Sequence, residues 1–247
     1  MSLPVYLTAP EALAGRGPGD VVRLEGPEGR HAVAVRRTRV GERVVLADGA
    51  GVGVTGEVVA LGRDTLDVRV ESAGTEPPPS PRFVLVQALA KGDRDDQAIE
   101  AATECGVDEV VPWQADRSIV RWRGERGEKS LRKWDAVLVA ATKQSRRTRR
   151  PVLAPAASTA DVAARIGSAA AAFVLHEDAS VPLAGAGLPA AGDVVVVVGP
   201  EGGITPAEVE AFTAAGATAV RLGGTVLRAS SAGPAALAVL SAASRWR

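Results

Sequence analysis

Residues 194–203 read Val-Val-Val-Val-Val-Gly-Pro-Glu-Gly-Gly, so five valines lead directly into a turn that holds three glycines. Five successive β-branched residues are typical of a strand buried on both faces, as in a parallel sheet. Thr205, Pro206 and Glu208 follow in the pattern of a capped helix start. The stretch therefore predicts a strand, a glycine loop and a helix. The loop would lie at the carboxyl edge of the sheet, where open α/β sheets bind ligands.

Strands and helices alternate on both sides of this stretch. The expected strands are 83–89, 107–112, 172–176, 194–198 and 219–222, and the expected helices are 94–105, 129–145, 159–167, 206–215 and 231–244. This alternation predicts an α/β domain with a parallel sheet over residues 82–247. Residues 76–81, Glu-Pro-Pro-Pro-Ser-Pro, can form neither a helix nor a central strand and are expected to be a linker.

Residues 1–75 have a different pattern. Short β-branched runs at 21–24, 44–47, 57–61 and 66–70 are separated by turn formers, which predicts a small β-barrel with a short helix at 31–39. Residues 51–56 match the motif G-x-G-x-x-G. A dinucleotide site would need a helix after this motif, and a strand is expected there instead. We therefore interpret the match as a turn between two strands.

Composition excludes several classes of function. Basic and acidic residues each number 29, so the chain is not a uniformly basic nucleic-acid binder. Cys105 is the only cysteine, and His31 and His176 are the only histidines. An intrachain disulfide and a metal centre built from cysteines or several histidines are therefore excluded, and no metal is expected. Without an apolar leader or a membrane-length apolar run, we expect a soluble cytoplasmic protein with no membrane partner.

Positive charge is concentrated in two stretches. Residues 117–150 carry a surplus of nine positive charges, and residues 30–43 hold a second basic cluster. In a neutral protein this segregation favours a polyanionic partner, chiefly RNA or DNA, although a solvated helix face is the alternative. The candidate RNA-binding residues are Arg30, His31, Arg36, Arg37, Arg146, Arg147, Arg149 and Arg150.

Two further segments end predicted strands and could meet the glycine loop. One begins at Leu175 and the other at Leu222, and strand-end loops of one sheet can converge on one pocket. A tight turn would need one glycine rather than three, so we favour a ligand-binding loop. The candidate pocket residues are Leu175, His176, Glu177, Gly199, Pro200, Glu201, Gly202, Gly203, Leu222, Gly223, Val226, Leu227, Arg228 and Ser230.

These segments belong to a larger set of motifs. In order along the chain the set consists of His31-x-x-x-Val35-Arg36-Arg37, Gly41, Asp48-Gly49, Thr103-Glu104-x-Gly106-Val107, Gln144-Ser145-x-Arg147-x-x-x-Pro151, His176-Glu177, the 199–203 loop and Leu222-Gly223-x-x-Val226-Leu227-Arg228. Together they span nearly the whole chain and resemble the RsmE family, the small-subunit ribosomal RNA uridine-N3 methyltransferases of the SPOUT class.

The resemblance implies a fold, a cofactor and partners. It implies an N-terminal PUA-like β-barrel that helps to grip RNA, and a C-terminal α/β domain tied in a trefoil knot that binds S-adenosyl-L-methionine. It also implies a homodimer that methylates N3 of a uridine in 16S ribosomal RNA, either as free RNA or in the small ribosomal subunit. A non-catalytic ribosome-assembly factor that binds RNA, or a knotted methyltransferase acting on tRNA, are the alternatives.

Three residues are candidates for catalysis under this resemblance. Arg228 and Arg147 could stabilise a uracil anion, and Glu201 could act as a general base or instead bond loop amides. The chain also departs from the family pattern. Where the family usually has Glu-Thr-Ala after the arginine, this chain has Ala229-Ser230-Ser231-Ala232, and Lys143 replaces a common Glu. Ser230 and Ser231 are expected to cap the last helix.

Overall fold

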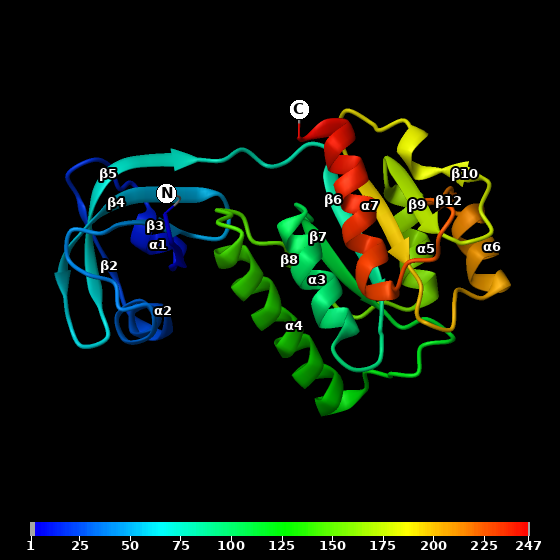
Figure 1. The fold of residues 1–247 in the computed structure, drawn as a ribbon, viewed down its shortest axis with the longest axis horizontal. Helices are drawn as coiled ribbons and strands as arrows, with labels where there is room; N and C mark the ends of the chain where they lie inside the picture. The colour runs from blue at the N-terminus through cyan, green and yellow to red at the C-terminus, as the bar shows by residue number, and fades with distance from the viewer. Residues whose placement is uncertain (1–2, 247) are drawn as a thin grey trace. The chain divides into compact units, whose positions relative to one another are not determined.

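The computed structural model describes residues 3–246, which divide into two compact units (Figure 1). Unit 1 consists of Met1–Pro78 with Thr142–Arg150, and unit 2 of Pro79–Ala141 with Pro151–Arg247. The first boundary falls inside the expected linker at 76–81. The expected division differs at residues 142–150, which belong to unit 1 rather than to the α/β domain. Hydrogen bonds explain this placement, since the amide of Arg150 donates to the carbonyl of Gly49 at 2.9 Å and Thr148 bonds the carboxylate of Glu76.

Unit 1 is built on a curled five-stranded sheet in the order β1-β3-β4-β5-β2. Its strands are β1 (Val5–Leu7), β2 (Val21–Leu24), β3 (Arg43–Ala47), β4 (Val52–Leu61) and β5 (Leu66–Thr75). The short helix α1 (Pro10–Leu13) contributes Leu13 to its core, and the short helix α2 (Gly26–Arg30) leads into a π-helical turn (His31–Val35) that contributes Ala32. Within residues 3–246, β1 and β2 each have one neighbour in the sheet, so the expected barrel is an open half-barrel.

Two details of unit 1 differ from the sequence prediction. The helix expected at 31–39 starts earlier and ends earlier, as α2 and the π-helical turn cover residues 26–35. Of the three glycines of residues 51–56, only Gly51, with a φ of 110°, lies in the turn between β3 and β4, because β4 already begins at Val52 and contains Gly53 and Gly56. Gly56 lies at a register shift in this strand, where a Cβ would come within 2.2 Å of the carbonyl oxygen of Arg69. Close approach of the paired strand therefore explains this glycine.

Unit 2 contains a seven-stranded parallel sheet in the order β10-β12-β9-β11-β6-β7-β8. The strands are β6 (Arg82–Ala88), β7 (Glu109–Trp113), β8 (Val152–Leu153), β9 (Ala171–Leu175), β10 (Val181–Pro182), β11 (Asp193–Val198) and β12 (Thr218–Arg221). The helices are α3 (Arg94–Glu104), α4 (Gly124–Gln144), α5 (Thr159–Ser168), α6 (Pro206–Ala214) and α7 (Ala229–Ser244), with a 3-10 turn at Leu183–Gly185. The last three residues of α4 belong to unit 1. The predicted parallel α/β architecture is confirmed.

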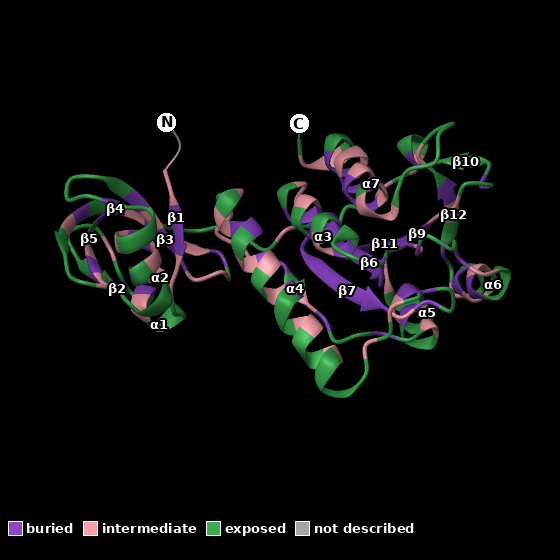
Figure 2. Ribbon diagram, turned by 60° about the horizontal axis from the view of Figure 1, so that its bottom comes forward, coloured by how far each residue is buried: buried purple, intermediate pink, exposed green. Residues whose placement is uncertain are grey.

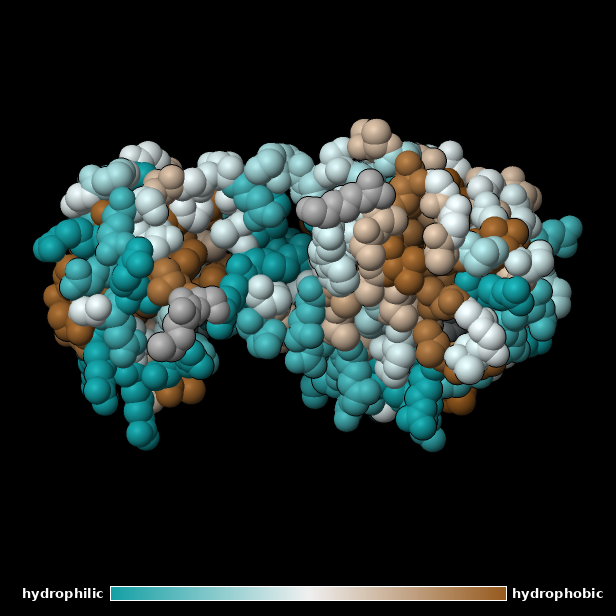
Figure 3. All heavy atoms as spheres, turned by 45° about the horizontal axis from the view of Figure 1, so that its top comes forward, coloured by the Kyte–Doolittle hydropathy of each residue, from teal (hydrophilic) through white to brown (hydrophobic). Residues whose placement is uncertain are grey.

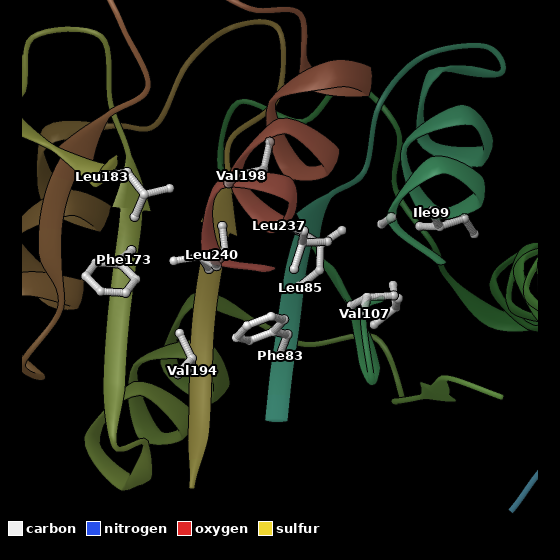
Figure 4. Close-up of a cluster of buried hydrophobic side chains, with 14 of the residues drawn as sticks. Phe83, Leu85, Ile99, Val107, Phe173, Leu183, Val194, Val198, Leu237 and Leu240 are labelled. Carbon is white, nitrogen blue, oxygen red and sulfur yellow. The ribbon is translucent and has the colours of Figure 1, made fainter. Parts of the chain in front are cut away.

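The two faces of this sheet enter separate hydrophobic cores. Phe83 and Leu85 of β6 pack in one core with Leu237 and Leu240 of α7, which Figure 4 shows in close-up. The alternate residues of β6 pack in the other core, with side chains of α5 and α6. The central strands β6, β7 and β11 are consequently buried throughout almost their whole length (Figure 2). A strand buried on both faces needs an unbroken apolar run, which explains the five valines of β11.

The last helix begins before its expected start at residue 231. Arg228 is the N-cap of α7, and no side-chain hydrogen bond caps the helix. Ser230 and Ser231 lie inside the first turn, so the prediction that they cap this helix is wrong. None of the helices in residues 3–246 has both the length and the apolar character needed to cross a membrane.

Candidate functional site

A hollow of about 850 Å³ lies at the carboxyl edge of the parallel sheet. Strands β12, β9 and β11 are neighbours in the sheet and run parallel, so the loops that follow them meet at this edge. The hollow is in the size range of sites for small molecules and cofactors. Twelve residues singled out from the sequence line it, namely Leu175, His176, Glu177, Gly199, Pro200, Glu201, Gly202, Gly203, Leu222, Gly223, Val226 and Leu227.

Three other candidates do not line the hollow. Arg228 and Ser230 follow the last loop at the start of α7, where the Arg228 side chain is exposed. Arg147 belongs to residues 142–150 and therefore to unit 1, whereas the hollow belongs to unit 2.

Each of the three glycines in the 199–203 loop is required by a local contact or by its backbone conformation. A Cβ on Gly199 would come within 2.5 Å of the Ile204 side chain, and a Cβ on Gly202 within 3.2 Å of Cβ of Arg117. Gly203 has a positive φ of 76°, a conformation that favours glycine. The glycines thus allow the loop to fold tightly against its neighbours, so the argument from their number alone does not establish a ligand site. The hollow itself is the stronger observation.

The Glu201 side chain ties this loop to the loop that follows β6. Its Oε1 accepts a hydrogen bond from Nη1 of Arg94 at 2.7 Å and from the amide of Lys91 at 3.4 Å. Partial burial alone would raise the pKa of the Glu201 carboxyl, but these bonds hold it below its usual range. A carboxylate with a lowered pKa is a weak proton acceptor. The geometry thus favours a positioning role for Glu201 over that of a general base.

His176 is placed at the end of β9 by two hydrogen bonds. Its amide donates to the carbonyl of Val220 on the adjacent strand at 2.9 Å. Its Nδ1 accepts from the amide of Asp178 at 3.2 Å, so in the neutral ring the proton lies on Nε2. The ring is thereby oriented on the wall of the hollow.

Arg117 contributes to the hollow although it was not a candidate. Its Nη1 donates to the carbonyl of Gly202 at 3.0 Å. It follows β7, a parallel strand of the same sheet, so its position after a strand end was the available signal. On α6, Pro206, Val209, Glu210 and Thr213 also line the hollow, and their spacing of three to four residues is that of one helix face.

The wall of the hollow combines apolar and charged groups. Leu175, Ile204, Leu222, Val226 and Leu227 supply apolar surface. The charged residues are the acids Glu177, Asp178, Glu201 and Glu210 and the bases Arg117 and Arg221. This composition suits an organic ligand with an apolar part and charges of both signs. Within residues 3–246, no group of three or more His, Cys, Asp or Glu side chains could hold a metal ion.

The candidate RNA-binding residues all belong to unit 1, and they differ in their freedom to bind a partner. Arg30, Arg36, Arg37 and Arg146 are exposed, whereas His31, Arg147, Arg149 and Arg150 are half-buried. Arg30 and His31 line a second hollow of about 740 Å³. The guanidinium of Arg149 bonds the carbonyls of Glu76 and Pro77, so this side chain also holds the last segment of unit 1 in place.

Lys143, which departs from the family pattern, has a structural explanation. Its Nζ lies 2.6 Å from Oε1 of Glu28 in α2, and both side chains are about four-fifths buried. A glutamate at this position would face another carboxylate, so the lysine is matched to its surroundings in unit 1.

Comparison with known proteins supplies the wider context. The family model described as "RNA methyltransferase domain" matches residues 77–241, and that described as "RNA methyltransferase PUA domain" matches residues 24–71. The chain is 45% identical to ribosomal RNA small subunit methyltransferase E of Mycobacterium bovis, over 92% of this chain and 89% of that protein. It is 27% identical to the Bacillus subtilis protein of the same name, over 88% of each chain.

Solved structures agree with this match. Ribosomal RNA small subunit methyltransferase E of Neisseria gonorrhoeae, solved with bound S-adenosyl methionine, superposes with a TM-score of 0.83 at 26% identity over 98% of each chain. A Legionella pneumophila protein, solved in complex with the cofactor SAM, superposes with the same score at 25% identity over 98% of each chain.

Proposed function

We propose, from the premise that this chain belongs to the ribosomal RNA small subunit methyltransferase E family, that it transfers a methyl group from S-adenosylmethionine to ribosomal RNA of the small subunit. The observation that carries the proposal is the hollow at the carboxyl edge of the unit 2 sheet. Relatives with the same fold were solved with this cofactor bound. The target that we propose is N3 of a uridine in 16S ribosomal RNA, as the family resemblance implies.

The residues around the hollow fit this methyl donor. Leu175, Leu222 and Leu227 supply apolar surface that suits an adenine ring. Glu177 offers a carboxylate to the positive groups of the donor, and Arg117 offers a guanidinium to its carboxylate. When bound, the donor supplies an electrophilic methyl group on a sulfonium centre.

The acceptor sets further requirements on the protein. N3 of uracil carries a proton at neutral pH and lies on the pairing edge, so the target must lose this proton and leave its base pair. A guanidinium near O2 or O4 would stabilise the uracil anion. We assign this role to Arg228, which is exposed immediately after the loop that lines the hollow. Arg147 stays a second candidate, and we assign Glu201 to holding the Lys91–Arg94 segment beside the glycine loop.

We also propose that the chain forms a homodimer, and the uncharged surface of α7 supports this. None of the sixteen residues of this helix is charged, although several of them face solvent. Figure 3 shows hydrophobic atoms gathered over this helix. A surface helix without charge is typical of a face that another protein covers, and a second copy of the chain is the partner that the family implies. The trefoil knot and a cytoplasmic location are proposals on the same basis.

The proposal is tested by measuring methyl transfer and donor binding separately. We expect the native chain to transfer a labelled methyl group to small ribosomal subunits from cells that lack its gene, with 3-methyluridine as the product in mass spectrometry. Arg228→Ala should retain its affinity for S-adenosylmethionine in calorimetry and transfer at least about 100-fold more slowly. The Arg228 side chain caps no helix group, so the fold should persist.

Each contrary result has a distinct meaning. Donor binding without transfer to any RNA would support the assembly-factor alternative. Label found only in tRNA would support the tRNA alternative. No donor binding would refute the assignment of the hollow.

A further inference from the structure

The loop between β7 and α4 is fixed by its own hydrogen bonds. The guanidinium of Arg121 donates to the carbonyls of Ala115 at 3.1 Å and Asp116 at 2.7 Å. The amide of Trp122 donates to Oε1 of Gln114 at 3.2 Å, which joins the two ends of the loop. Residues 114–122 therefore form a closed loop with a defined shape.

This loop is also attached to the hollow. The amide of Asp116 donates at 2.7 Å to the carboxylate of Glu208, a buried residue of α6. Arg117 donates to the carbonyl of Gly202, and its Cβ packs close to that glycine. The position of the loop tip is thus fixed relative to the candidate donor site.

Ile119 lies at the tip and is 78% exposed. Arg117, Arg121 and Arg123, all exposed, lie on either side of it, and residues 117–124 contain no acidic residue. An apolar tip between guanidinium groups matches nucleic acid, because the guanidinium groups suit phosphates and the apolar side chain suits the face of a base. If this loop instead contacted the same loop of a second copy, six arginines would come together and repel one another. The uncharged helix α7 is therefore the better surface for a second copy.

We propose that Ile119 is a wedge that enters the base stack of the RNA next to the target nucleotide. The inference rests on the proposed function, because a nucleotide modified on its pairing edge must leave the stack. Unstacking costs free energy, and proteins offset it by inserting apolar side chains between neighbouring bases. Ile119 takes the place that the target base leaves, while the exposed Arg121 and Arg123 bind the adjacent phosphates.

The test compares Ile119→Ala and Ile119→Leu with the native chain. The substrates are small ribosomal subunits that lack the modification and a short unstructured RNA containing uridines. On the subunits we expect Ile119→Ala to reduce kcat/KM about tenfold or more and Ile119→Leu to restore most of the loss. On the unstructured RNA, whose bases are already unstacked, the loss should be less than about threefold. The affinity for S-adenosylmethionine should not change. The matched control is Val152→Ala, which removes an apolar side chain that is 56% exposed on β8 of the same unit.

The contrary outcomes separate the wedge from other roles. Equal kcat/KM for Ile119→Ala and the native chain on the subunits would overturn the inference. So would an equal loss on both RNAs, a weakened donor affinity, or a change in oligomeric state. If the native chain binds the subunits and transfers no methyl group to either RNA, the proposed function fails, and the wedge fails with it.

Discussion

Asp95 is the residue whose replacement should stabilise the protein most clearly. It lies in the first turn of α3, only 6% exposed, and burial together with the neighbouring Asp96 raises the pKa of its carboxyl to about 6. The ordinary pKa of this carboxyl, which we expect in the unfolded chain, is 3.8, so the native and unfolded values differ by about two units. This difference corresponds to roughly 2 to 3 kcal/mol of unfolding free energy. Asp95→Asn keeps the size of the side chain and an acceptor oxygen for the amide of Asp96, which bonds it at 3.0 Å.

The sign of the pH dependence follows from the raised pKa. Below about pH 4 the Asp95 carboxyl is largely protonated in both the native protein and the unfolded chain, so its burial lowers the stability of the native protein only a little. As the pH rises towards 6, the unfolded chain releases its proton first, so the native protein loses stability that Asp95→Asn does not lose. We therefore expect the two proteins to differ little near pH 4, and the variant to be more stable by roughly 2 to 3 kcal/mol above pH 6.

Urea unfolding measured at several pH values tests this prediction. The quantity compared is the difference in unfolding free energy between variant and native chain, because the contributions of other groups then cancel. Glu100→Gln, which removes one negative charge from an exposed position on the same helix, is the control for the loss of charge alone. Parallel curves for Asp95→Asn and the native chain from pH 4 to 8 would refute the reasoning.

Three further changes should each lower stability, with urea unfolding as the measurement. Arg245→Met removes an ion pair with the buried carboxylate of Asp108, so we expect a loss of about 3 kcal/mol; a loss below about 1 kcal/mol would contradict this. Glu208→Ala removes a buried capping carboxylate that accepts four hydrogen bonds and should cost about 3 kcal/mol, whereas Glu208→Gln should cost less. Lys143→Glu places a carboxylate against Glu28 and should destabilise unit 1 by about 2 kcal/mol. The double variant that also carries Glu28→Lys restores an ion pair with the charges exchanged and should recover most of this loss. If the double variant recovers none of it, the ion pair is unimportant for stability.

Sequence reasoning predicted most long regular elements of unit 2 well, because each has a strong local signal. The exception is α4, which begins at Gly124 rather than at the expected residue 129. The valine run of β11 and the capping box of α6 place both elements to within one residue of their observed bounds. The strands β8 and β10 were missed because two residues are too short to show a period. The sequence also did not indicate that residues 142–150 belong to unit 1, and the reason is different. Their placement depends on contacts such as Lys143 with Glu28, which are 115 positions apart and leave no local pattern.

The candidate site also contains residues that the sequence predicted and residues that it missed. The loops after β9, β11 and β12 were predicted because each follows a recognisable strand of one parallel sheet. Arg94 and Arg117 were missed, because their part depends on the order of strands in space. β6 pairs with β11 although Phe83 and Val194 are 111 positions apart, and β7 pairs with β6. Only this order brings the loops after β6 and β7 beside the glycine loop.

The glycine loop is therefore held from both sides by charged side chains of other loops. Arg94 bonds Glu201 from the first residue of α3, at the end of the loop after β6, and Arg117 bonds the carbonyl of Gly202 from the loop after β7. The second of these loops also carries Ile119 at its tip, so the surface that we assign to RNA and the loop that we assign to the methyl donor share a hydrogen bond. A shift of either loop must strain or break that bond. Donor and RNA should consequently affect one another's binding, and by linkage the effect must be equal in both directions.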